Sequence, residues 1–143
     1  MKEFFNEPFV LECGAVLPNL EIEYTTYGRL SPRRDNVIWV CHALTADSRV
    51  AEWWPHTVEC GRFLDPERWF VVCANFLASP YGTTSPVSIN PATGVRYGGD
   101  FPMITVRDMV AAHRRLARRL GIERVELLVG SSIGGFQAME WAI

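Results

Sequence analysis

A chain of 143 residues is long enough for one ordinary domain, and its 48% apolar and 21% charged residues are typical of a globular protein with a core. Its 14 basic and 16 acidic residues leave a net charge of −2, which gives no reason to expect nucleic acid or an anionic membrane as a partner. No apolar run is long enough to span a bilayer, and the opening MKEFFNEPFV mixes acids with apolar residues, unlike a signal peptide.

Five segments are patterned as strands. Residues 9–14 (FVLECG) and 20–28 (LEIEYTTYG) alternate apolar and polar residues, as strands with one buried face do. Three further segments are continuous apolar runs, typical of strands buried on both faces: 36–43 (NVIWVCHA), 68–76 (RWFVVCANF) and 125–130 (VELLVG). We predict that these three runs form neighbouring parallel strands over residues 36–41, 69–74 and 125–129.

The four cysteines show no CxxC spacing, which argues against a zinc or redox site. Cys41 and Cys73 lie within the apolar runs, whereas Cys13 and Cys60 lie outside them. We therefore expect free thiols, buried at the first two positions, in a cytoplasmic protein.

The segment 77–102 is a long connection that holds four prolines and four glycines. Loops of this length in compact domains are usually functional or disordered. The aromatic residues Tyr81, Tyr97 and Phe101 favour a loop that packs against the rest of the fold.

The spacing of apolar residues predicts a helix over 105–120, with Thr105 and Asp108 resembling a capping box and Gly121 ending it. His113 lies on its apolar side, where a structural histidine is the expected interpretation. The polar side carries a cluster of arginines, which we interpret as a solvated face rather than a phosphate site: Arg114, Arg115, Arg118 and Arg119.

The alternation of apolar strands with a helix indicates an α/β fold, with a mostly parallel central sheet and flanking helices. Residues 130–134 (GSSIG) fit the G-x-S-x-G pattern of a nucleophile elbow. The pattern is weak alone, but here it follows an apolar strand and precedes a helical segment, as an elbow must. Ser132 is the predicted nucleophile; the alternative is a glycine-rich turn that binds phosphate, although it lacks the P-loop order.

An oxyanion hole needs two backbone N–H donors. The first is expected from Ile133, which follows the nucleophile. The second comes in this architecture from the loop after an earlier strand, here the loop CHALTADS that starts at Cys41. Leu44 is the candidate, with Ala43 and Thr45 as alternatives. His42 lies in the same loop and is expected to shape that loop rather than act as the base.

Several segments are distinctive when taken together. They are CHALTADS, the double tryptophan Trp53-Trp54, the long block INPATGVRYGGDFPMITVRDMV and the final LGIERVELLVGSSIGGFQAMEWAI. Together they resemble the homoserine O-acetyltransferase family of the α/β-hydrolase superfamily. The resemblance runs from about Phe9 to Ile143, and the long block is its most specific part.

The resemblance implies acyl transfer in two steps. Ser132 would attack the thioester of acetyl-CoA, a co-substrate, and the hydroxyl of L-homoserine would then accept the acetyl group for methionine biosynthesis. It also implies a cytoplasmic homodimer with no bound cofactor or metal. The residues themselves indicate only serine acyl chemistry.

Two departures from the family are visible. Residues 130–135 read GSSIGG where members often read GGSMGG, and the loop 75–86 differs mildly, which leaves the acyl donor and acceptor open. Members are also more than twice as long. We therefore expect residues 1–143 to be the N-terminal portion of a single α/β-hydrolase domain, with the catalytic acid and base beyond Ile143 and little activity in this portion alone.

Three alternatives stay open. Relatives use succinyl-CoA or accept serine, so a homoserine or serine O-succinyltransferase is one. An esterase or thioesterase, in which water replaces homoserine, is the second, although such an enzyme has no evident need for the SINPATG block (88–94). The third is an inactive truncated domain, or one completed by a second chain.

Overall fold

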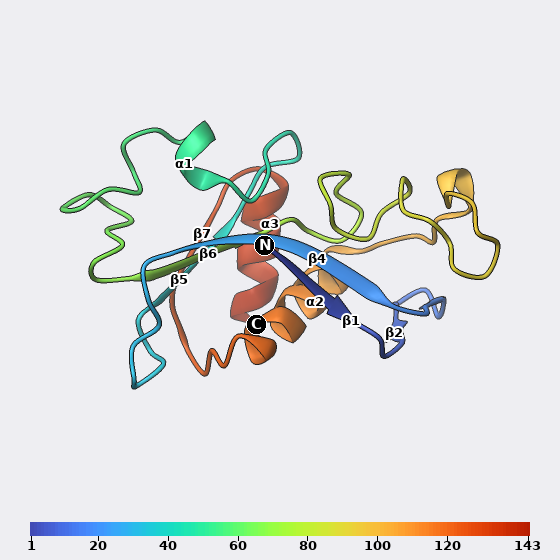
Figure 1. Cartoon of the computed structure of the whole chain (residues 1–143), viewed down its shortest axis with the longest axis horizontal. Coiled ribbons are helices and arrows are strands. Elements are labelled where there is room, and N and C mark those ends of the chain that lie inside the picture. Colours follow the sequence, from blue (N-terminus) through green and yellow to red (C-terminus); the bar gives the residue numbers. More distant parts are fainter.

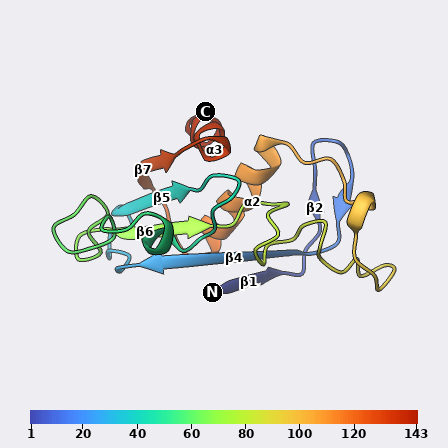
Figure 2. The same ribbon diagram turned by 90° about the horizontal axis from the view of Figure 1, so that it is seen from above.

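A computed structural model describes residues 1–143 as a five-stranded sheet with helices on both faces (Figure 1). The strand order is β1-β4-β6-β5-β7, and a separate hairpin pairs β2 with β3. Helices α2 and α3 cover one face, while α1 and the segment after it cover the other (Figures 1 and 2). The strands are β1 (Lys2–Phe5), β2 (Phe9–Val10), β3 (Val16–Leu17), β4 (Leu20–Tyr27), β5 (Val37–Cys41), β6 (Phe70–Ala74) and β7 (Val125–Gly130). The helices are α1 (Val50–Trp53), α2 (Val106–Arg119) and α3 (Ile133–Ala142), with a 3₁₀ turn at Gly98–Asp100.

The three continuous apolar runs form neighbouring parallel strands, as predicted. β5 pairs in parallel with β6 on one side and with β7 on the other. All five residues of β5 are buried, because its side chains point alternately to the two covered faces of the sheet. Val37, Trp39 and Cys41 face α2 and α3, while Ile38 and Val40 face α1. β4 and β1 continue the sheet with antiparallel pairing, so the sheet as a whole is mixed.

The prediction of a strand over 9–14 is correct only for Phe9–Val10. The chain then turns at once, because the Gly14 N–H donates to the Leu11 carbonyl and Gly14 has a φ of +84° that favours glycine. The strand β1 has no counterpart in the sequence pattern, since four residues with two charges are too few to show a period.

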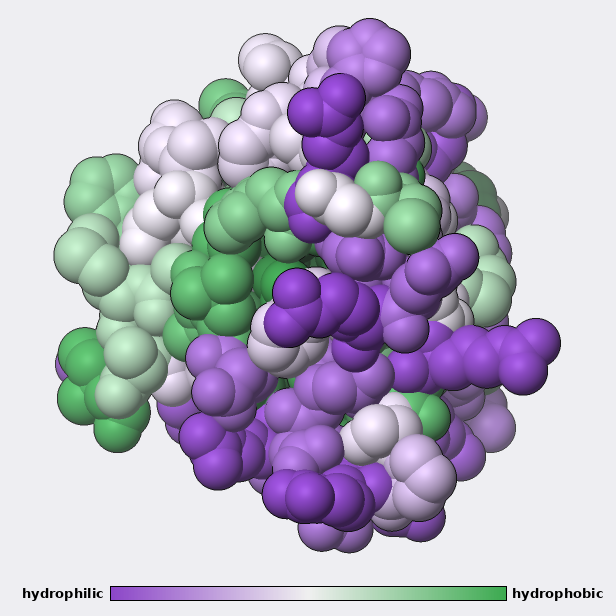
Figure 3. Space-filling view, turned by 90° about the vertical axis from the view of Figure 1, so that its left-hand side faces the viewer, coloured by the Kyte–Doolittle hydropathy of each residue, from purple (hydrophilic) through white to green (hydrophobic).

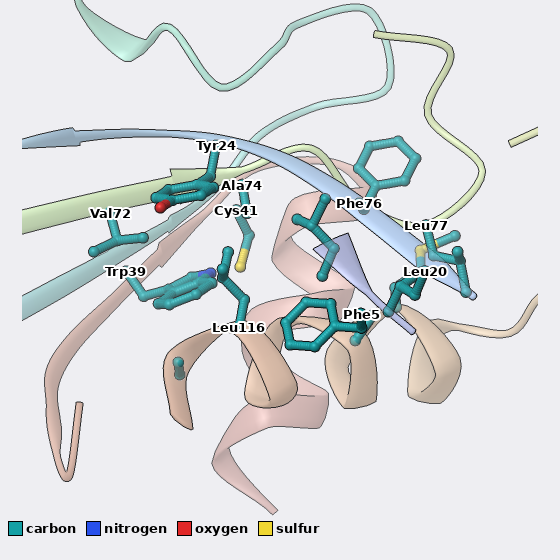
Figure 4. Close-up of a cluster of buried hydrophobic side chains, with 14 of the residues drawn as sticks. Phe5, Leu20, Tyr24, Trp39, Cys41, Val72, Ala74, Phe76, Leu77 and Leu116 are labelled. Atoms are coloured by element: carbon teal, nitrogen blue, oxygen red, sulfur yellow. The ribbon is translucent and has the colours of Figure 1, made fainter. Parts of the chain in front are cut away.

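The main core lies between the sheet and α2 (Figure 4). Trp39 and Leu116 are fully buried there, and Phe5 reaches the same core from β1. A smaller core on the other face packs Val50 of α1 and Leu64 against the sheet. The sheet is therefore covered on both sides along its central strands, as the continuous apolar runs require.

Helix α2 begins with the predicted capping box, in which the side chains of Thr105 and Asp108 each bond the other's backbone N–H. His113 is fully buried, which confirms its structural interpretation. Three of the four arginines are more than a solvated face. Arg114 donates to the Trp141 carbonyl of α3 at 2.7 Å. Arg115 and Arg119 form ion pairs with Glu7 and Glu3 at 2.8 and 3.1 Å, and both guanidinium groups lie over the ring of Phe5. They tie α2 to the N-terminal strand.

The long connection 77–102 extends to one side of the sheet and holds the 3₁₀ turn (Figures 1 and 2). Its first part is packed, since Leu77, Ser79 and Thr84 are buried, and Tyr97 meets Phe101 edge to face at 5.3 Å. None of the helices is long and apolar enough to cross a membrane.

Strand β7 forms one edge of the sheet, and Leu127 on it is 40% exposed. Phe136 and Met139 of α3 are exposed as well. Figure 3 shows apolar side chains gathered on the side of the molecule where β7 and α1 lie. An apolar, unpaired edge is a template for pairing with another chain.

We expect the purified 143-residue chain to self-associate through this edge, and Leu127→Lys to reduce the association by placing a charge on it. Sedimentation velocity over a series of protein concentrations measures the effect. Val95→Lys is the matched control, because Val95 is 62% exposed on the distant long connection. A monomeric unmodified chain, or equal effects of both lysines, would contradict the prediction.

Candidate active site

Ser132 lies in the turn between β7 and α3, at the N-cap of the helix. Its φ of 54° and ψ of −129° are outside the regions that residues with a Cβ normally adopt. Strain of this kind costs about 1–3 kcal/mol and is concentrated at functional sites. The residue is exposed, so the turn presents the Ser132 hydroxyl to the outside at the positive end of a helix.

The turn is tight because the backbone on both sides of Ser132 is in contact with other backbone. A Cβ on Gly130 would overlap the carbonyl group of Gly134. A Cβ on Gly134 would overlap the carbonyl oxygens of Cys41 and His42 at the end of β5. Both positions therefore require glycine, as the G-x-S-x-G pattern predicts. Gly135 has ordinary space around it.

The two loops that were predicted to supply N–H donors lie side by side. Cys41, the last residue of β5, is the register partner of Gly130, the last residue of β7. Because both strands run the same way, the residues that follow each of them leave the sheet at the same level. Ile133 is the first residue of α3, so its N–H has no acceptor within the helix.

The loop after β5 closes as a turn, in which the Ala46 N–H donates to the Ala43 carbonyl at 3.0 Å. Leu44 and Thr45 occupy the tip of that turn and are exposed. The backbone geometry therefore brings the candidate residues Leu44, Ile133 and Ser132 to one end of the sheet. Their catalytic roles remain a prediction.

No hydrogen bond joins Ser132 to a histidine or a carboxylate in this chain. His42 is buried, and its Nδ1 lies 2.8 Å from the carbonyl of Ala43, which is what a residue that shapes its own loop should do. Burial lowers the pKa of His42, and burial lowers the pKa of His113 to about 3, so both imidazoles are neutral.

A cavity of about 310 Å³ lies beside the elbow, on the face of the sheet that carries α1. Ser131 is among the residues that line it, whereas Ser132 is not. Trp53 and Trp54 form its aromatic wall, with ring planes 11° apart and centroids at 6.1 Å. The sequence pattern did not predict α1 or this cavity; the double tryptophan is the one signal that pointed there.

The cysteines follow the expectation for free thiols, with Cys41 and Cys73 buried and no disulfide formed. Burial raises the pKa of Cys41 to about 12, so it is no nucleophile near neutral pH. Outside the elbow, the potential ligand atoms of Cys60, Asp65 and Glu67 lie within 4.8 Å of one another. Both carboxylate oxygens of Asp65 already accept backbone N–H groups of that loop, which gives Asp65 a structural role.

A strained serine between a buried parallel strand and a helix, with two glycines in backbone contact, defines a nucleophile elbow on an α/β sheet. The sequence profile of the alpha/beta hydrolase fold matches residues 36–143, which is most of the chain. The chain belongs to the alpha/beta hydrolase family.

The curated relatives narrow the comparison. The chain is 52% identical over 136 residues to a homoserine O-acetyltransferase of Chlorobium chlorochromatii, covering 95% of this chain and 38% of the relative. It is 46% identical to a homoserine O-succinyltransferase of Acidithiobacillus ferrooxidans, covering 97% of this chain and 39% of that protein. The chain thus spans about two fifths of the length of these relatives.

Solved structures show the same architecture. Esterase E22 superposes with a TM-score of 0.90 at 32% identity, covering 99% of this chain and 43% of the esterase. The homoserine O-acetyltransferase of Bacillus anthracis gives 0.89 at 33% identity, with coverage of 99% and 42%. The backbone alone does not separate these two activities.

The glycine contacts can be tested in a chimera, in which residues 1–143 precede the C-terminal portion of the Chlorobium chlorochromatii relative. Gly134→Ala should lower the free energy of unfolding by about 1–3 kcal/mol, because the added methyl overlaps rigid backbone. Gly135→Ala should be neutral or slightly stabilising, since the added methyl makes only an ordinary van der Waals contact with Gly130 and alanine favours helix. Urea denaturation measures both, and equal costs would contradict the assignment of the tight contact to Gly134.

Proposed function

We propose that this chain is the nucleophile-bearing part of a homoserine O-acetyltransferase. This enzyme moves an acetyl group from acetyl-CoA to the hydroxyl of L-homoserine through an acyl-enzyme on Ser132. One observation carries the proposal: Ser132 has the strained backbone of a nucleophile elbow, with φ 54°. The 52% identity to a protein named homoserine O-acetyltransferase supports the substrates.

In the first half-reaction, the Ser132 oxygen attacks the thioester carbonyl and the CoA thiol leaves with a proton. The negative charge that develops on the carbonyl oxygen is held by the N–H groups of Ile133 and Leu44, which lie in the segments that follow the neighbouring parallel strands β7 and β5. In the second half-reaction, the homoserine hydroxyl attacks the acyl-enzyme, loses its proton and releases Ser132.

A serine needs a base to accept its proton, and in this fold the acid and the histidine follow the nucleophile in chain order. Neither buried histidine of this chain bonds Ser132. We assign the base and its acidic partner to the part of the relatives' length that this chain does not span. We further propose a cytoplasmic homodimer that serves methionine biosynthesis, as the resemblance of the sequence to the homoserine O-acetyltransferase family implies.

A second candidate is an ester hydrolase, in which water replaces homoserine. The superposition on esterase E22 favours it, with a TM-score of 0.90. Succinyl-CoA is the competing donor, because a homoserine O-succinyltransferase shares 46% identity. Mass spectrometry of the chimera's products distinguishes O-acetyl-homoserine, O-succinyl-homoserine and free acid. Free acid alone would contradict the transferase proposal.

Ser132→Ala in the chimera should abolish acyl-enzyme formation and slow transfer by roughly 10⁴-fold or more, as expected for a triad nucleophile. Ser131→Ala is the matched control and should retain measurable acylation, because Ser131 lines the neighbouring cavity. Peptide mapping after incubation with acetyl-CoA locates the acyl group. An acyl group on Ser131 would show that the nucleophile has been misassigned.

A further inference from the structure

The side chain of Trp53 joins the face of the sheet beside the elbow to the loop that follows β5. Trp53 is the last residue of α1, which lies on the face of the sheet opposite α2 and α3 (Figure 1). Its indole N–H donates to the Asp47 carbonyl at 2.8 Å. Its ring packs on the smaller core and lines the cavity beside the elbow, together with Val129 and Ser131. One side chain therefore borders the elbow and also holds the loop after β5.

The tip of that loop is held by few contacts. The loop forms a turn that is closed by the hydrogen bond from the Ala46 N–H to the Ala43 carbonyl. Leu44 and Thr45 at the tip are exposed and form no backbone hydrogen bond, so the Leu44 N–H has no acceptor in the protein. Because nothing holds the tip itself, its position is set by the two ends of the turn.

The two ends of the turn are fixed in different ways. At the first end, His42 directly follows β5 and is buried, and its Nδ1 lies 2.8 Å from the Ala43 carbonyl. At the second end, the Asp47 carbonyl accepts the Trp53 N–H and no backbone N–H. The other donor to this carbonyl is the Cys73 thiol, at 3.9 Å. A thiol is a weak donor, so the indole N–H is the main contact that holds this end.

The neighbouring contacts of the loop do not replace that of Trp53. The Asp47 carboxylate bonds the backbone N–H and the guanidinium of Arg49, which is exposed and belongs to the same segment. Exposed ion pairs contribute little to stability. Ser48, one residue further, is anchored to β4 by a hydrogen bond with the Thr25 hydroxyl at 3.0 Å. The Asp47 peptide, between the turn and this anchor, thus depends on Trp53.

We propose that Trp53 is a positioning residue for the second oxyanion donor. By fixing the Asp47 carbonyl, its indole N–H sets the direction in which the chain leaves the turn, and with it the direction of the Leu44 N–H. A donor stabilises an oxyanion only when it is already aimed at the oxygen, and a small misplacement removes much of its effect. This role rests on the proposed function, in which Leu44 is the second donor.

Trp54 offers a comparison within the same chain. Its ring lines the same cavity and lies 6.1 Å from the ring of Trp53. It is 37% exposed, and it packs on Phe63. Of these two indole N–H groups, only that of Trp53 donates to the protein. Both tryptophans therefore shape the cavity, but only Trp53 holds the turn.

Kinetics of the chimera with p-nitrophenyl acetate test the role. Trp53→Phe keeps an aromatic ring but loses the N–H, so the acylation kcat should fall about 10-fold with little change in KM, because an oxyanion donor acts mainly in the transition state. Trp54→Phe is the matched control, since it makes the same change in the same cavity wall, and it should keep kcat within about twofold. Release of p-nitrophenolate in the first turnover measures both. Equal losses in the two variants, or no loss in Trp53→Phe, would overturn the proposal.

A second variant isolates the hydrogen bond from the shape of the ring. Benzothienylalanine in place of Trp53 keeps the outline of the indole, but its ring sulfur cannot donate. We expect the same loss of about 10-fold in the acylation kcat, again with KM unchanged. Full activity of this variant would show that the shape of the ring matters and the hydrogen bond does not, which would overturn the proposal.

The ester contains neither CoA nor homoserine, so the two proposals can fail separately. If Trp53→Phe slows acylation by the ester but the chimera makes no acylated homoserine from acetyl-CoA, the proposed transfer fails and the role of Trp53 stands. If acylated homoserine forms and Trp53→Phe is acylated as fast as the unmodified chimera, the role of Trp53 fails and the transfer stands.

Discussion

The site depends on the contact between Gly134 and the last carbonyls of β5, at Cys41 and His42. Because this contact is backbone against backbone, helix α3 starts directly against the neighbouring strand β5. There is no room for a Cβ on Gly134 between them. The contact fixes Ser132 relative to the loop after β5. The unfavourable φ of Ser132 is offset by the rest of α3, where Trp141 packs on Trp39 at a centroid distance of 4.7 Å.

The parallel pairing of β5 also fixes where the segments that form the site leave the sheet. β5 is buried on both faces and pairs in parallel with both neighbours, so the residues after Cys41, Ala74 and Gly130 all leave the sheet at one end. Ligands of open α/β sheets bind at this end of the strands. His42, Asn75 and Ser132 follow these strands, which is why a buried polar pair and an exposed nucleophile lie within one small region.

The sequence predicted the elements with strong local patterns. The apolar runs around Trp39 and before Gly130 showed the parallel strands, and the capping box at Thr105 showed the start of α2. The site was predictable as far as Ser132 because an elbow needs its glycines at fixed spacing. The surroundings of His42 were not, because Asn75, which affects the pKa of His42, is 33 residues away in sequence and follows the neighbouring strand β6. Short or irregular elements, such as α1, carry too few residues to show a period.

The central claim is that one oxyanion site is formed by the backbone after β5 and after β7. The most direct measurement is a crystal structure of the chimera after reaction with a p-nitrophenyl phosphonate, which mimics the tetrahedral intermediate. We expect phosphorus bonded to Ser132 Oγ and its free oxygen about 2.7–3.1 Å from the N–H groups of Ile133 and Leu44. Phosphorus on another residue, or an oxygen that meets neither N–H group, would contradict the claim.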